Sequence, residues 1–68
     1  MVDQNFQLGQ LFAAYGRAVK RLENETKIAS KTIEGRFPIT QLYTQFWPPS
    51  SDSEGRLYEH IKAQLTKP

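Results

Sequence analysis

The 68-residue sequence predicts a single all-α domain, with three main helices and one short connecting helix. Three observations predict this fold class. Apolar residues recur at steps of three and four over a long proline-free segment. The same spacing returns in shorter form after each break in the pattern. No segment alternates with period two, and the chain has no Asn-Gly or Asp-Gly pair of the kind that turns a β-hairpin.

The first helix is predicted over about residues 3–24, with Asp3 as its N-cap. Its apolar stripe consists of Leu8, Leu11, Phe12, Tyr15, Ala18, Val19 and Leu22. On another side, Gly9, Ala13 and Gly16 form a strip of small residues, in which each glycine costs about 1 kcal/mol relative to alanine. Either the strip lets a partner approach closely, or a well-packed helix simply tolerates the glycines.

A short connecting helix is predicted over about residues 27–36, with Thr26 or Ser30 as its cap. Pro38 ends it, because the proline ring disfavours the helical conformation at the preceding residue and brings no amide hydrogen. Apolar spacing then predicts a third main element, a helix over about residues 38–46.

A Pro/Ser-rich loop is predicted over residues 47–53, followed by a last helix over about residues 54–66. The segment Ser51–Glu54 resembles a capping box, in which the serine and glutamate side chains satisfy each other's backbone amides. Trp47 lies at the start of this loop, next to Pro48 and Pro49. We expect it either to plug the end of the core or to anchor a partner.

The composition argues against catalysis. The chain has no cysteine and one histidine, His60, so a thiolate metal site, a disulfide and a cysteine nucleophile are excluded. Acidic residues are scattered singly, and no glycine-rich phosphate loop occurs. The sequence therefore predicts a non-enzymatic binding module with no catalytic residue, metal, cofactor or small-molecule substrate.

Two absences bear on location. No apolar run reaches the 18 residues or more of a typical membrane span, and the first residues lack the charged and apolar parts of a signal peptide. We expect a cytoplasmic protein without a membrane partner.

Basic residues gather in the middle of the chain. Residues 17–36 hold six basic and three acidic side chains, a local net charge of +3. The basic residues follow one another at helical or near-helical intervals: Arg17, Lys20, Arg21, Lys27, Lys31 and Arg36. Such an arc attracts a phosphate backbone or an acidic partner surface. The alternative is a solvated face that Glu23 and Glu34 partly neutralise.

Two segments carry a resemblance to a known family. Leu8–Ala13 (Leu-Gly-Gln-Leu-Phe-Ala) resembles the Leu-Gly-Arg-Leu-Phe-Ala stretch in the C-terminal part of the large subunit of type I-C CRISPR surveillance complexes. Thr32–Phe37 is similar to that family's Thr-Ile-Arg/Lys-Asp-x-Tyr-Phe/Tyr segment, at similar spacing. The resemblance covers about residues 6–47. Gln10 replaces the family's arginine, and Pro38-Ile39-Thr40 replaces its Ala-Ser-x-x-Pro run.

The resemblance implies a helical bundle that is also made separately as a small subunit. In the family, this bundle packs along the inner face of the assembly and supports displaced DNA through basic side chains. The resemblance implies packing positions at Leu8, Gly9, Leu11, Phe12 and Ala13.

The leading hypothesis is a module that docks into a larger protein or ribonucleoprotein complex, as a CRISPR small subunit or as an anti-CRISPR mimic of it. In this hypothesis Gly9, Ala13, Gly16 and Trp47 pack on the partner, and weak, non-specific DNA or RNA contact is expected. The alternative is a free-standing nucleic-acid-binding regulator, with a dimer as one option. That regulator would need a recognition helix, for which residues 26–36 are the candidate.

Overall fold

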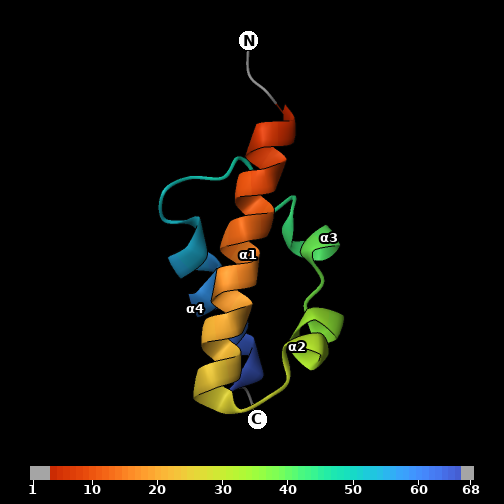
Figure 1. Ribbon diagram of the computed structural model, residues 1–68, viewed down its shortest axis with the longest axis vertical. Coiled ribbons are helices and arrows are strands. Elements are labelled where there is room, and N and C mark those ends of the chain that lie inside the picture. Colours follow the sequence, from red (N-terminus) through yellow and green to blue (C-terminus); the bar gives the residue numbers. More distant parts are fainter. Residues whose placement is uncertain (1–3, 67–68) are drawn as a thin grey trace.

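The computed structural model describes residues 4–66, which fold into four helices (Figure 1). They are α1 (Gln4–Thr26), α2 (Ser30–Arg36), α3 (Ile39–Leu42) and α4 (Ser53–Leu65). No strand occurs among these residues, which confirms the all-α class. Asp3, the predicted N-cap of the first helix, lies outside the described residues.

Helix α1 is the central element of the structure. The chain returns along one side of α1 through α2 and α3, crosses over, and then runs parallel to α1 in α4 (Figure 1). Helices α4 and α2 make the most extensive contacts with α1. The core between them is formed by Leu11, Ala14, Tyr15, Ala18, Val19, Leu22, Ile33, Leu42, Phe46, Leu57, Tyr58 and Ile61.

The predicted apolar stripe of α1 is confirmed at five positions and wrong at one. Leu11, Tyr15, Ala18, Val19 and Leu22 are buried, and Leu8 is half-buried. Phe12, in contrast, is 48% exposed. The buried arc is displaced from the predicted one, because α4 packs on the side that carries Ala14, whereas α3 does not close over Phe12.

Helix α1 continues two residues beyond its predicted end. Lys27, the residue after it, has a φ of 64°, and its amide donates to the Glu23 carbonyl oxygen at 2.9 Å. This left-handed residue closes the helix in the manner of a C-terminal cap. The Thr26 hydroxyl donates to the Leu22 carbonyl oxygen at 2.6 Å, so Thr26 belongs to α1.

The predicted cap of the second helix is wrong. Helix α2 begins at Ser30, and its N-cap Ala29 has no side chain that could bond a backbone amide. The carboxylate of Glu23, on α1, accepts from the Ser30 amide at 2.9 Å instead. A negative group at this place satisfies an unpaired amide and complements the helix dipole.

Helix α3 is shorter than predicted. It spans four residues, with Pro38 as its N-cap, and residues 43–45 form turns. The connection to α4 therefore covers residues 43–52, and the Trp47–Pro48 peptide bond in it is cis. The segment just before α3 is bonded to α1, because the Tyr15 hydroxyl donates to the Phe37 carbonyl oxygen at 2.6 Å.

The predicted capping box is also wrong. Helix α4 begins at Ser53 with Asp52 as its N-cap, and no N-cap side chain bonds a helix amide. The buried Ser53 hydroxyl accepts from the Ser50 amide at 2.7 Å, outside the helix. The serine-rich segment therefore stabilises the turn before α4 and not the first turn of the helix.

Candidate binding surface

One side of α1 is left uncovered, because α4 and α2 pack on its other sides (Figure 1). At about 100° per residue, seven positions of α1 lie within an arc of about 100° on this side, among them Phe6 and Asn24. The other five, Gly9, Ala13, Gly16, Arg17 and Lys20, we call the open face of α1. Gly16 is half-buried and the other four are exposed.

The packing within the chain gives no reason for glycine on the open face. A Cβ atom placed on Gly9 or Gly16 would meet no atom within 4 Å. Each glycine nevertheless costs the interior of α1 about 1 kcal/mol. Gly35 and Gly55 have equally open surroundings but lie in the end turns of their helices. Gly9 and Gly16 therefore do not serve the contacts between the four helices.

The open face carries two exposed cations. Arg17 and Lys20 are exposed, and neither forms an ion pair with the residues that the structure describes. Toward the N-terminus of α1 from these two cations, the exposed residues Gly9, Gln10 and Ala13 are uncharged. Glu23 lies three residues after Lys20, but its carboxylate accepts from the Ser30 amide. A surface with cations that form no ion pair attracts acidic groups or phosphates.

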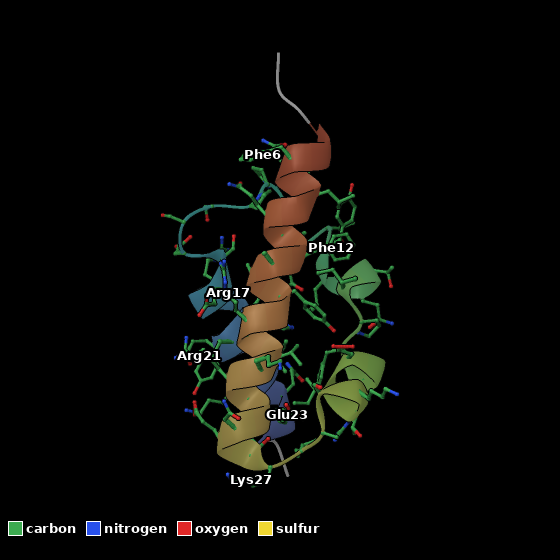
Figure 2. The ribbon with its side chains drawn as sticks, viewed as in Figure 1. Phe6, Phe12, Arg17, Arg21, Glu23 and Lys27 are labelled. Atoms are coloured by element: carbon green, nitrogen blue, oxygen red, sulfur yellow. The ribbon has the colours of Figure 1, made fainter. Side chains whose placement is uncertain are left out.

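Arg21 does not belong to this free set. Figure 2 shows Arg17 and Arg21 on the same side of α1, with Phe12 on the other side. The Arg21 guanidinium lies 3.6 Å from the Glu54 carboxylate and 4.1 Å from the centre of the Tyr58 ring. The Tyr58 hydroxyl in turn donates to Glu25. Arg21 thus joins α1 to α4, and the sequence prediction that placed it with Arg17 and Lys20 needs this correction.

The other predicted basic residues lie elsewhere. Lys27 follows the end of α1, at the lower end of the molecule in Figure 2. Lys31 and Arg36 are exposed on α2, but their five-residue separation places them about 140° apart around that helix. The Arg36 guanidinium lies 5.8 Å from the centre of the Phe37 ring. The six basic residues therefore do not form one continuous arc.

Trp47 is half-buried and packs against the core. Its ring centre lies 5.2 Å from that of Tyr43, in a tilted arrangement. This position matches the core-plug alternative better than that of a protruding anchor.

An apolar pocket was not predicted from the sequence. Its volume is 170 Å³, and it lies between α1 and α3 with adjoining residues: Leu8, Phe12, Ile39, Thr40 and Tyr43. The signal that could have indicated it is the absence of charge. Residues 4–16 and 37–51 contain no Asp, Glu, Lys or Arg.

Few groups have a shifted pKa. Burial, with the nearby negative charge of Glu34, raises the pKa of Tyr15. A hydrogen bond from the Ser50 hydroxyl lowers the pKa of Asp52, and a hydrogen bond with the Tyr58 hydroxyl raises that of Lys62. None of these groups lies in the pocket or on the open face.

His60 packs on an aromatic ring. It is half-buried, with its ring edge-on to Phe46 at a centroid distance of 5.5 Å. Across residues 4–66, no three His, Cys, Asp or Glu side chains gather in a group that could hold a metal ion. Within the same part of the chain, no helix combines the length and apolar content needed to cross a bilayer.

Comparisons with protein family models, with curated proteins and with solved structures find no match to this chain. The open face and the pocket are therefore interpreted from their own chemistry.

Proposed function

We propose that this chain is a non-enzymatic binding module that docks into a larger protein–nucleic-acid assembly through the open face of α1. The observation that carries the proposal is the combination of small and basic residues on one uncovered helix side. Gly9 and Gly16 reduce the stability of α1 without serving its internal packing. Residues that break a local rule in this way are typical of functional surfaces.

The small residues determine how a partner can approach. At Gly9, Ala13 and Gly16 the open face carries no side chain larger than a methyl group, so another backbone can come close to this part of α1 and make van der Waals contact with it. Arg17 and Lys20 continue the same side toward the C-terminal half of α1. A partner that covers Gly9 and Ala13 would bring its own acidic groups, or nucleic acid that it holds, to these two cations.

The short α2 favours docking over the free-standing regulator. A recognition helix presents several side chains to base edges along the major groove. Helix α2 has seven residues, and its two cations point about 140° apart. Weak, non-specific phosphate contact through Arg17 and Lys20 remains part of the proposal.

Because of the resemblance to the type I-C large subunit, the type I-C surveillance complex is the first assembly to test. In it the chain would act as the CRISPR small subunit or as an anti-CRISPR mimic of that subunit. Both roles place the module in the cytoplasm. The chain should co-migrate on a sizing column with a type I-C surveillance complex that lacks its own small subunit. Binding only to the complex that lacks its small subunit would support a shared site. No binding to the complex, with or without that subunit, would reject this assembly.

Two pairs of variants locate the docking surface. Ala13→Leu adds bulk on the open face and should abolish co-migration, whereas Ala63→Leu adds the same bulk at an exposed position of α4 and should not. Lys20→Glu should weaken binding more than Lys31→Glu, which makes the same single change on α2. Equal effects within either pair would contradict the assignment of the open face.

A salt titration separates docking from autonomous DNA binding. A regulator holds duplex DNA by itself and loses affinity steeply between about 50 and 200 mM salt. The proposed module should show little affinity for DNA in the absence of its assembly. Tight binding to free duplex would favour the regulator.

A further inference from the structure

The pocket between α1 and α3 remains unused by the docking proposal. It is lined by Leu8, Phe12, Ile39, Thr40 and Tyr43, and its walls are almost entirely apolar. Both aromatic side chains of the lining are exposed, Phe12 at 48% and Tyr43 at 39%. Large aromatic side chains with this much exposure beside an apolar pocket are typical of a protein-binding surface.

The distribution of charge around the pocket is uneven. Residues 4–16 and 37–51, which supply every residue of its lining, contain no charged side chain. Within residues 4–66, all Asp, Glu, Lys and Arg lie in 17–36 and 52–62. The depletion of charge is the compositional mark of the buried centre of an interface.

We propose that a second copy of this chain covers the pocket, in a two-fold dimer. Near a two-fold axis each residue faces its own copy, so a charged side chain at that place would meet a like charge. The segments around the pocket can face their own copy without that cost. A two-fold contact places the same patch on both molecules, and an uncharged patch then brings no like charges together.

The pocket has the size that a phenyl ring requires. An apolar cavity of about 150 Å³ binds benzene, and this pocket measures 170 Å³. Phe12 is the more exposed of the two aromatic residues in the lining. In the proposed dimer the Phe12 ring of each molecule enters the pocket of the other, beside Tyr43 and Ile39. This dimer does not rest on the docking proposal, because the open face contributes none of the pocket residues.

Sedimentation equilibrium of the chain alone tests the dimer. Between about 10 µM and 1 mM, the mass should rise from the monomer value of 7.8 kDa to that of a dimer. Phe12→Lys should weaken dimerisation at least about 30-fold, the effect of losing a central aromatic contact. Gln10→Lys places the same charge on an exposed site of the same helix and should leave dimerisation unchanged.

Added salt provides a second readout. An apolar, charge-free contact should not weaken between about 50 and 500 mM NaCl. Circular dichroism should show that Phe12→Lys is folded, because this side chain is already half in solvent.

Three results would overturn the proposal. They are a monomer mass at every concentration, equal weakening by Phe12→Lys and Gln10→Lys, and dissociation of the dimer by salt. If the chain stays monomeric, and Phe12→Lys abolishes its binding to the larger assembly, the pocket binds another protein and not a second copy. Failure of the docking test leaves this result unaffected, since the dimer is measured without any assembly.

Discussion

The Tyr15 hydroxyl donates a 2.6 Å hydrogen bond to the carbonyl oxygen of Phe37, which lies 22 residues further along the chain. Tyr15 belongs to α1, and Phe37 is the residue that follows α2. The bond therefore fixes the corner between α2 and α3 on the central helix. Because the ring of Tyr15 is buried and Phe37 is half-buried, water cannot replace this contact without cost.

Tyr15→Phe should lower the free energy of unfolding by about 1–2 kcal/mol, because it removes one hydrogen bond and leaves a half-buried carbonyl without its partner. Urea denaturation measures the change. Tyr43→Phe is the matched control, since the exposed Tyr43 hydroxyl makes no hydrogen bond within residues 4–66. It should change stability by less than about 0.5 kcal/mol. A similar loss in both variants would rule out a specific role for the Tyr15 contact.

Alkaline pH should destabilise the protein through Tyr15. Burial and Glu34 raise its pKa in the folded state above the ordinary value of 10.0. The folded chain then binds this proton more tightly than the unfolded chain. The contribution is fully present below pH 10.0 and is lost as the pH rises through the folded-state pKa. Urea midpoints at increasing pH should therefore fall more for the natural chain than for Tyr15→Phe. Parallel pH profiles would contradict this assignment.

Lys27→Gly should stabilise the protein by about 1 kcal/mol. Lys27 has a φ of 64°, where a side chain is strained and glycine is not. Lys27→Ala removes the same charge but keeps the Cβ atom, so it should give no such gain. Thermal denaturation of the two variants compares them directly. The explanation by backbone strain would be lost if alanine stabilised as much as glycine.

Gly9→Ala and Gly16→Ala should each raise stability by about 1 kcal/mol, because alanine favours the helix interior and the added Cβ meets no atom within 4 Å. The docking proposal adds that assembly binding should weaken as stability rises. Gly55→Ala serves as the control on α4, where stability is expected to rise without an effect on binding. Unchanged binding by both α1 variants would show that their glycines serve no docking contact.

The helical pattern predicted most of the core but not its edges. The spacing of Leu11, Ala18 and Leu22 identified the side of α1 that is fully buried. Periodicity gives the direction of a side chain, but not how far a neighbouring element extends over it. Phe12 therefore appeared to be a core residue, although α3 leaves it half in solvent.

The details of the candidate surface depend on contacts between distant residues. Arg21 is held by Glu54 and Tyr58, both more than 30 residues away in the sequence, so its spacing from Arg17 could not show that it is engaged. The same reason explains the cap of α2, which Glu23 of α1 supplies. Local sequence favoured Thr26 or Ser30 as the cap, because serine and threonine commonly take that role.

The shortness of α3 has a consequence for amide hydrogen exchange. Its four residues contribute one buried side chain, Leu42, whereas α1 is anchored to the core along most of its length. Amide protons of α3 should therefore exchange through local opening, while those in the middle of α1 exchange only with global unfolding. Because α3 forms one wall of the pocket, local opening of this short helix would change the width of the pocket while α1 and α4 stay packed.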